Sequence, residues 1–252
     1  MKGITRTFVA VVAVFTMVAM AAPADAQSSK AAWRFKSVIA LGATAPGGTN
    51  DTGWVDILTT HIKTPNAKEL AIGASLQCGL VTDTTVRSKN GDLDSSASRG
   101  RIKVRIKITQ PDGSVVYAQP NNGADLVTDI SFDNSGNGLT YCDRYQKLEA
   151  RFSGLNCTAD LETGAVTCAD PEELRLLLKT LSAHHFNFLH ANAVPGVQTV
   201  TVQARAQAGI LLGGTQLGDA GAEAFVGAGA LSVETIRLIK DADGTADLDN
   251  LR

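Results

Sequence analysis

The nine residues Arg101–Thr109 read RIKVRIKIT and alternate strictly between polar and apolar side chains. Successive side chains on a β-strand point to opposite faces of the sheet, so this stretch predicts a strand whose isoleucine and valine side chains face a core. The other face carries a row of cations, called the basic row below: Arg101, Lys103, Arg105 and Lys107. The following QPDG, Gln110–Gly113, is typical of a tight turn into a next strand, SVVYA.

Period-two alternation recurs along much of the chain. From Leu70 to Leu80 every even position is apolar, which predicts a long strand with Cys78 on its core face. The remaining expected strands are Trp33–Leu41, Trp54–Ile62, Leu126–Phe132, Leu148–Phe152, Phe186–Leu189, Val197–Ala206 and Leu231–Ile239. Glycine-rich and polar turns such as SKNGD and NSGNG separate these strands.

One segment, residues 171–183, favours a short helix. Asp170 is a good N-cap, Pro171 suits the first turn and Glu173 completes a capping box. The leucines that follow make an apolar stripe at helical spacing: Leu174, Leu177, Leu178 and Leu181. About ten strands with a single helix predict an all-β fold, an antiparallel β-sandwich of the kind that includes jelly rolls.

The N-terminus has the layout of a secretory signal peptide. MKGITR is a short basic region, an uninterrupted apolar run follows, and Ala24-Asp25-Ala26 is a small-x-small cleavage site. We expect residues 1–26 to be the signal peptide and residues 27–252 to form one β-sandwich domain. After cleavage no apolar run is long enough to span a membrane, which predicts a secreted or periplasmic protein.

Export changes the interpretation of the four cysteines, since disulfides persist in oxidising compartments. In LNCTADLETGAVTC the turn is centred on Glu162 and Thr163, so a symmetric hairpin places Cys157 opposite Cys168. We therefore predict the disulfides Cys157–Cys168 and Cys78–Cys142. A zinc site is disfavoured because the cysteines lack C-x-x-C spacing.

Composition bears on the class of partner. The formal net charge is −2, whereas nucleic-acid-binding proteins usually carry a pronounced basic excess, so nucleic acid is not expected. The basic row is the best candidate ligand surface, suited to an anionic glycan or a lipid headgroup. Like charges along one strand repel one another, so the alternative is a row offset by neighbouring acidic side chains or by water.

A calcium site is a weaker candidate. Asp133, Ser135 and Asn137 occupy the first, third and fifth places of an oxygen-ligand loop, with Gly138 sixth. The twelfth place, which should hold a bidentate glutamate, is Arg144. The alternative is a polar turn, and no other cofactor is expected.

The segment AHHFNFLH, Ala183–His190, holds three of the four histidines. Strand geometry places His184, Phe186, Phe188 and His190 on one face and His185 on the other. The residues between the same-face histidines are phenylalanines, so we expect a core face with polar ends and not a metal site.

No motif for nucleophilic catalysis is present, because the sequence lacks a G-x-S-x-G elbow and its cysteines are expected to be oxidised. The sequence predicts a non-catalytic binding or surface-structural module, whose partner is an anionic glycan or another envelope protein. Two alternatives stay open. One is a carbohydrate-active hydrolase with acids on several loops, and the other is a self-assembling envelope or appendage subunit that uses an exposed edge strand.

Overall fold

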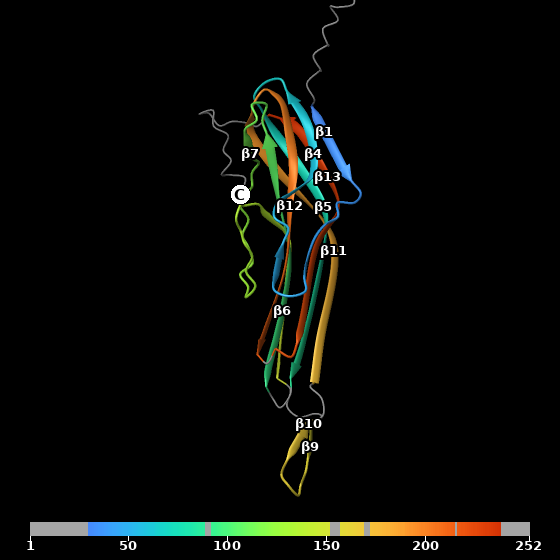
Figure 1. The fold of residues 1–252 in the computed structure, drawn as a ribbon. Coiled ribbons are helices and arrows are strands. Elements are labelled where there is room, and N and C mark those ends of the chain that lie inside the picture. Colours follow the sequence, from blue (N-terminus) through green and yellow to red (C-terminus); the bar gives the residue numbers. More distant parts are fainter. Residues whose placement is uncertain (1–29, 89–91, 152–156, 169–171, 215, 238–252) are drawn as a thin grey trace, which may run out of the picture.

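The computed structural model describes residues 30–88, 92–151, 157–168, 172–214 and 216–237, except for the side chains of Cys157 and residues 166–168. The signal peptide predicted over residues 1–26 lies outside this part of the chain. Figure 1 shows an elongated molecule whose strands run along its long axis. The strands are β1 (Ala31–Lys36), β2 (Leu41–Ala45), β3 (Thr49–Asp51), β4 (Val55–Thr64), β5 (Lys68–Ser88), β6 (Leu93–Thr109), β7 (Val115–Tyr117), β8 (Leu139–Arg151), β9 (Cys157–Ala159), β10 (Val166–Cys168), β11 (Glu172–Ala193), β12 (Gly196–Gly214) and β13 (Asp219–Ile236).

Two antiparallel sheets build the sandwich. Sheet A has the order β1-β13-β5-β11, with β2 also paired to β13, and sheet B has the order β3-β12-β6-β7, with β4 on β12 and β8 on β6. Three pairs of short strands each lie end to end along one neighbouring strand, and each pair acts as a single interrupted strand. These pairs are β1 with β2, β3 with β4, and β7 with β8. If each of these pairs is counted as one strand and the separate hairpin β9–β10 is left out, eight strands follow one another along the chain. In that numbering the two sheets have the orders 1-8-3-6 and 2-7-4-5, which is the jelly-roll arrangement.

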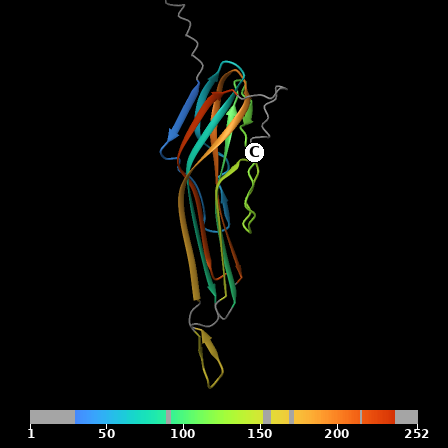
Figure 2. The same ribbon diagram turned by 180° about the vertical axis from the view of Figure 1, so that it is seen from behind.

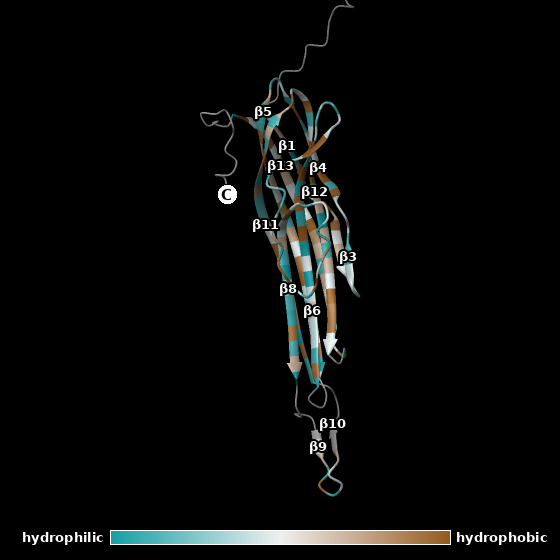
Figure 3. Cartoon of the chain, turned by 90° about the vertical axis from the view of Figure 1, so that its left-hand side faces the viewer, coloured by the Kyte–Doolittle hydropathy of each residue, from teal (hydrophilic) through white to brown (hydrophobic). Residues whose placement is uncertain are grey.

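The core lies between the two sheets and is aliphatic along most of its length. The apolar face of β6 is fully buried, with Ile102, Val104, Ile106 and Ile108 each at 0% exposure. Even-numbered residues of β5, from Leu70 to Cys78, are buried against it, as their alternation predicts. Figure 3 shows hydrophilic and hydrophobic colours alternating along β6 and β8. The Cys78–Cys142 disulfide joins β5 of sheet A to β8 of sheet B, which confirms that predicted pair.

The helix predicted near residues 171–183 is wrong. Residues from Glu172 onward form β11, a 22-residue strand that pairs with β5 from Ser88 to Lys68. Its proposed N-cap, Asp170, and Pro171 lie outside the described residues. Helix propensity is a weak preference, and pairing with a long neighbouring strand overrides it here. Among the described residues no helix long and apolar enough to cross a membrane is present.

A second correction concerns Leu126–Phe132, which is not a strand. It belongs to an irregular stretch between β7 and β8, residues 118–138, which we call the covering segment. The segment leaves the edge of sheet B after Tyr117 and returns to the same edge at Leu139. It is therefore an insertion within one strand position of the jelly roll.

The hairpin β9–β10 lies beyond the ends of β8 and β11 (Figures 1 and 2). Its backbone register places Cys157 opposite Cys168, as the turn residues predict. The side chains of both cysteines are outside the described set, so the Cys157–Cys168 disulfide stays a prediction.

The interior becomes polar toward the hairpin end of the sandwich. Gln146 of β8 accepts a hydrogen bond from Thr82 at 2.9 Å, and its amide nitrogen donates to Thr84 and to the backbone oxygen of Leu176. Ser96 and Ser98 of β6 are buried in the same region. Small polar residues fill this end, so the leucines of β11 have no deep aliphatic core to enter.

Candidate functional site

The basic row does not form the open cationic surface that its alternation suggested. Arg101 and Lys103 are only 1% and 2% exposed, because the covering segment lies over this face of sheet B. These contacts fit the interpretation of a row offset by neighbouring acidic side chains. Ligand binding by these four residues stays a prediction.

Carboxylates from the covering segment and from β4 form ion pairs with three of the four cations of the row. Asp125 forms ion pairs with Arg101 at 2.8 Å and with Lys103 at 3.4 Å. Asp56 of β4 forms an ion pair with Lys107 at 2.8 Å. Buried charges are tolerated when they are paired and hydrogen-bonded, which these contacts achieve.

The pKa values reflect this balance between burial and pairing. Burial lowers the pKa of Arg101 and Lys103, and the charge of Asp125 partly offsets that effect. For Asp125, burial alone raises the pKa, but the hydrogen bond from Thr140 and the two nearby cations outweigh it and lower the pKa overall. The pairing with Asp125 thus opposes the effect of burial on both cations.

Two further arginines extend the network beyond the row. Arg99 of β6 binds Asp143 through two hydrogen bonds of 3.0 and 2.6 Å. Arg205 of β12 binds Asp51 and Asp133 at 2.6 and 2.8 Å. The hydrogen bond that Arg205 donates to Asp51 raises the pKa of Arg205 despite its burial. Bidentate guanidinium–carboxylate contacts of this kind are strong and geometrically specific.

The arginines also satisfy the backbone of the covering segment. Arg99 donates to the carbonyl oxygens of Leu126 and Ile130, at 3.0 and 2.8 Å, and Arg105 donates to that of Gly136 at 2.6 Å. An irregular segment has no ladder for its carbonyl groups, so they need such partners when they lie against a sheet. The basic row thus holds the covering segment in place.

Aromatic rings complete the packing around these cations. Arg99 and Arg101 lie 5.2 and 4.9 Å from the centre of the Phe132 ring. Arg105 lies between Trp54 and Tyr117, at 4.2 and 4.5 Å from their ring centres. Cation–π contacts within about 6 Å are attractive, and more so where water is excluded.

The calcium candidate is engaged in the same network. The carboxylate of Asp133 accepts hydrogen bonds from the backbone nitrogen and the hydroxyl of Ser135, at 2.8 and 2.5 Å, and pairs with Arg205. Asn137 adopts a left-handed backbone, with φ of 57°. The described residues hold no group of three or more His, Cys, Asp or Glu side chains placed to share a metal ion. Calcium binding by Asp133, Ser135 and Asn137 stays a prediction.

The histidines of AHHFNFLH lie on opposite faces of β11. The His184 ring packs edge-on against Tyr141 at 5.7 Å, and the Phe186 and Phe188 rings contact each other on that face at 5.9 Å. Phe188 is buried, whereas Phe186 is exposed. His185 lies on the other face, so the predicted alternation holds and the three imidazoles do not converge.

His185 belongs to a hydrogen-bonded chain that sequence reasoning missed. Its Nδ1 lies 2.7 Å from the Ser75 hydroxyl, and its Nε2 lies 2.8 Å from Oδ1 of Asn187. With Asn187 as acceptor, Nε2 carries the proton and Nδ1 accepts from Ser75. This order of serine, base and orienting group resembles that of nucleophilic hydrolases. The sequence places His185 and Asn187 on the same face of the expected strand, which could have indicated a contact between them. Their partner Ser75 is 110 residues away in the sequence and gave no such indication.

A second feature outside the predicted site is the apolar edge of sheet A. Strand β11 is the last strand of that sheet and carries large exposed side chains on both faces. We call this set the leucine edge: Leu174, Leu176, Leu177, Leu178 and Leu181, which are 39–59% exposed. Long apolar edge strands are uncommon in natural proteins, because they invite pairing with another chain.

The backbone of the leucine edge is open on one side. Near its end, Leu189 exchanges two hydrogen bonds with Gln119 of the covering segment, at 2.8 and 2.7 Å. From Glu172 to His190 the pairing with β5 runs without a register shift, so every odd residue directs its N–H and C=O away from β5, as Leu189 does. Within the described parts of the chain, no strand pairs with that side of β11 between Glu172 and Phe188.

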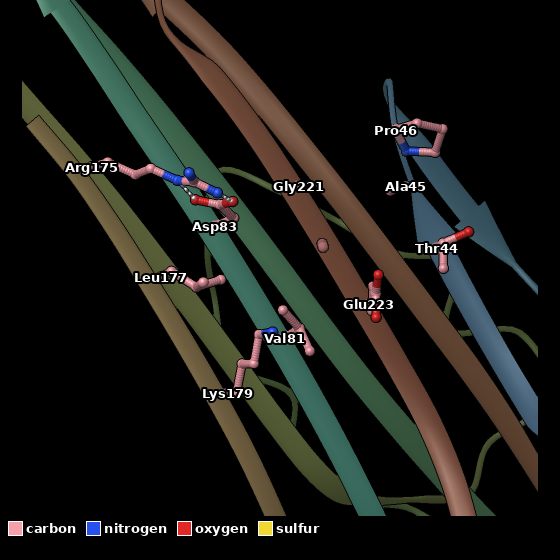
Figure 4. A pocket seen from close by; sticks show the side chains of 11 residues that line it. Thr44, Ala45, Pro46, Val81, Asp83, Arg175, Leu177, Lys179, Gly221 and Glu223 are labelled. Carbon is pink, nitrogen blue, oxygen red and sulfur yellow. Dashed lines mark hydrogen bonds and ion pairs between the residues drawn. The ribbon is translucent and has the colours of Figure 1, made fainter. Parts of the chain in front are cut away.

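A shallow hollow adjoins this edge on the outer face of sheet A (Figure 4). Leu177 and Lys179 of β11 line it, together with Glu223 of β13 and Thr44 of β2. At its side Arg175 forms a bidentate pair with Asp83, with contacts of 2.9 and 2.5 Å. The ammonium group of Lys179 forms no salt bridge among the described residues, and Figure 4 shows it beside Val81.

Comparisons with known proteins do not assign a family. No family model and no curated protein matches the sequence. Among solved structures, the chain is similar to the structure of infectious bursal disease virus, Gx strain, with 11% identity over 82% of this chain and 40% of that chain and a TM-score of 0.19. A mutant VP2 protein of infectious bursal disease virus, from derived T=1 particles, gives 12% identity, 87% and 43% coverage and a TM-score of 0.19.

The chain spans about two fifths of the length of those viral chains. TM-scores this low carry no argument about fold or function. The jelly-roll assignment rests on the strand order of the molecule itself. The features that bear on function are its leucine edge, its covered basic row and its serine–histidine–asparagine chain.

Proposed function

We propose that this protein is a non-catalytic, exported surface-structural module that binds a polypeptide partner along the leucine edge of β11. The observation that carries the proposal is the combination of an open hydrogen-bonding edge with exposed leucines on both faces of the same strand. Strand addition uses these two features together, since backbone groups supply affinity and side-chain contacts supply specificity.

The energetic argument for a partner is direct. Exposed contiguous apolar surface on a monomer usually marks an interaction site. Burying one leucine side chain contributes about 1.5–3 kcal/mol relative to leaving it exposed. The exposed parts of five leucines on one strand are therefore apolar surface that a partner would bury favourably.

Export is supported by the signal-peptide pattern at residues 1–26 and by the Cys78–Cys142 disulfide. Disulfides that join the two sheets of a sandwich are typical of secreted and periplasmic proteins and rare in reducing compartments. The proposed partner is accordingly a protein of the cell envelope or of the exterior.

An anionic glycan is less favoured as the partner. The cations that would receive it are paired with Asp125 and Asp56 and lie under the covering segment. A glycan would have to displace those carboxylates before it reached the row, at the cost of leaving them unpaired.

The hydrolase alternative now has one specific observation in its favour, the chain from Ser75 through His185 to Asn187. Two features argue against catalysis there. Ser75 lies in the middle of a strand that pairs with neighbours on both sides, opposite His185 and Ala230. The N–H of the next residue, Leu76, donates to the Tyr141 hydroxyl at 2.8 Å, so it is not free to bind an oxyanion. Asn187 also carries no charge to stabilise an imidazolium ion.

The proposal is tested by photo-cross-linking in the producing cell. Benzoylphenylalanine replaces Leu177 at the leucine edge in one variant and Val115, an exposed residue of β7, in the matched control. We expect a cross-linked polypeptide at position 177 and none at 115. Equal yields at both positions, or none at 177, would overturn the edge as a binding site.

Catalysis is tested separately with the purified protein. A fluorophosphonate probe should leave Ser75 unlabelled, and hydrolysis of a nitrophenyl ester should not change in Ser75→Ala. Labelling that disappears in both Ser75→Ala and His185→Gln would establish a reactive serine and contradict the non-catalytic assignment.

A further inference from the structure

We infer that the partner at the leucine edge is a second copy of this chain, bound by antiparallel β11–β11 pairing about a two-fold axis at Leu176. This inference rests on the proposed function and specifies its partner. The paired region is the hairpin end of β11, since the covering segment already occupies the edge at Leu189.

The charges of β11 select this register. Pairing about Leu176 places Glu173 of one copy opposite Lys179 of the other, and the two-fold axis repeats that contact. Opposite charges directly across an antiparallel pair are favourable. Lys179 forms no salt bridge among the described residues, and Glu173 pairs only with Arg87 at the exposed surface, so both side chains can reach across.

The leucines agree with the same register. On the inner face, Leu174 lies opposite Leu178 of the partner copy and Leu176 lies opposite itself. On the outer face, Leu177 lies opposite the stem of Arg175. Each leucine that is exposed in the single chain between Glu173 and Lys179 thus gains an apolar neighbour.

Adjacent symmetric registers are worse. An axis at Leu177 places Arg175 opposite Lys179, and an axis at Arg175 places that arginine opposite itself. Both put like charges face to face, which is destabilising. A shift by a single residue in the pairing would place inner-face leucines against outer-face charges.

The backbone geometry is compatible with the Leu176 axis. Odd residues of β11 direct their N–H and C=O toward the open side. In this register odd residues pair with odd ones, Arg175 with Leu177 and Glu173 with Lys179, and each pair exchanges two hydrogen bonds. Leu176 and its copy form a non-hydrogen-bonded pair, in which the Cα atoms lie about 4.5 Å apart. Two copies of sheet A then form one continuous sheet, and the interface is isologous.

A cysteine at the axis tests the register. Leu176→Cys should form an intermolecular disulfide under mild oxidation, giving a band of twice the mass that disappears on reduction. Leu181→Cys is the matched control, because Leu181 lies outside the paired region and should stay monomeric on the same gel. A self-cross-link at 181 but not at 176 would contradict the Leu176 axis.

A charge exchange tests the pairing of unlike charges. Glu173→Lys and Lys179→Glu each put like charges opposite each other in a homodimer, so each should raise the dimer dissociation constant about tenfold. An equimolar mixture of the two variants restores the Glu–Lys contacts and should form heterodimers, which native mass spectrometry resolves. Homodimers that are unaffected by either substitution would overturn the register.

A proline tests the use of the open edge. Leu177→Pro removes an N–H that points away from β5, so β5–β11 pairing survives and the second copy is blocked. We expect at least about a tenfold weaker dimer by analytical ultracentrifugation, whereas Leu177→Thr keeps the N–H and should retain more of the dimer. If Leu177→Pro fails to fold, the Leu176→Cys cross-link still decides the inference.

The two proposals fail in different ways. If the purified protein is monomeric at all accessible concentrations but position 177 cross-links to another polypeptide, self-pairing is wrong and edge binding stands. If the protein is monomeric and position 177 cross-links to nothing, both are wrong. A dimer that Leu177→Pro leaves intact would place the contact elsewhere on the molecule and overturn the self-pairing of β11.

Discussion

The basic row of β6 and the leucine edge of β11 reverse the usual relation between polarity and burial. The row is charged and covered, with Arg101 at 1% exposure, and the edge is apolar and open, with Leu174 at 47% exposure. Both strands belong to the same sandwich. The difference lies in what covers each strand, a chain segment of the protein itself in one case and, in our proposal, a second molecule in the other.

This contrast shows where stability and function are separated in the molecule. The charged row is tied to the covering segment by paired carboxylates and carbonyl groups, so it should be sensitive to substitution. The leucine side chains of the edge are about half exposed, so their substitution should matter less. Four predictions test this contrast, beginning with the largest expected effect.

The largest effect should come from Asp125→Ala. This substitution leaves Arg101 and Lys103 buried without their carboxylate and removes the acceptor of the Thr140 hydrogen bond. Breaking a buried ion pair by removing one partner costs about 3–5 kcal/mol, and we expect a value near the lower end because Asp125 is partly exposed. Urea unfolding followed by circular dichroism measures the loss.

Asp129→Ala is the matched control. Asp129 lies in the same covering segment and pairs with Lys147 at 3.1 Å, but both side chains are exposed. Exposed pairs contribute little to stability, so this variant should remain close to the wild type. Equal losses for the two variants would mean that burial of the row does not set the energetic cost.

The second effect should come from the disulfide between the sheets. Replacing both Cys78 and Cys142 with alanine removes a link that closes a loop of 64 residues in the unfolded chain. Such links typically contribute about 2–4 kcal/mol, so the double variant should unfold at lower urea but keep its strand content. An unchanged unfolding midpoint would show that the link does not stabilise the sandwich.

Much of the fold was accessible from the sequence, because strand alternation reports a core face directly. RIKVRIKIT and the even positions of Leu70–Leu80 identified the central strands of both sheets and the inward side chains that fill the core. The hairpin register at Cys157 and Cys168 followed from its turn residues. The strand order did not follow, since pairing between strands distant in sequence depends on the whole chain.

The failures share one physical cause, which is that local patterns do not reveal what lies on the outer side of a strand. The acids that pair with the basic row were missed because nothing in the sequence shows that Asp125 and the covering segment lie over β6. The leucines after Asp170 looked helical because their spacing also fits one helix face, and only the presence of β5 alongside makes them a strand. Ser75 gave no sign of its contact with His185, which pairing across the sheet creates.

The third effect is a pH dependence with two separate windows. Burial lowers the pKa of His190 below its ordinary value of 6.5, so the unfolded chain takes up a proton before the folded chain does. Stability should therefore begin to fall as the pH drops below about 6.5. The carboxylates that pair with the basic row, such as Asp125, have pKa values below their ordinary 3.8. Their contribution to the stability of the fold is therefore retained until the pH falls under about 4.

His190→Gln separates the two windows. This variant lacks the titrating ring, so its stability should be flat between pH 7 and pH 5. It should still lose stability under about pH 4, where the carboxylates become protonated. Thermal melts across this range measure both variants. A wild-type profile that is flat between pH 7 and pH 5 would contradict the buried, neutral state of His190.

The smallest effect should come from the leucine edge itself. Leu181→Ala removes a side chain that is exposed on β11 and lies outside the proposed dimer contact, so the unfolding free energy should change by no more than about 0.5 kcal/mol. Leu76→Ala, in the core face of β5 at 1% exposure, makes the same chemical change and should cost about 2–5 kcal/mol. If Leu181→Ala costs as much as Leu76→Ala, the edge is part of the fold. A small cost means that the stability of the chain does not require a leucine at this exposed position of β11, in contrast to the leucine on the core face of β5.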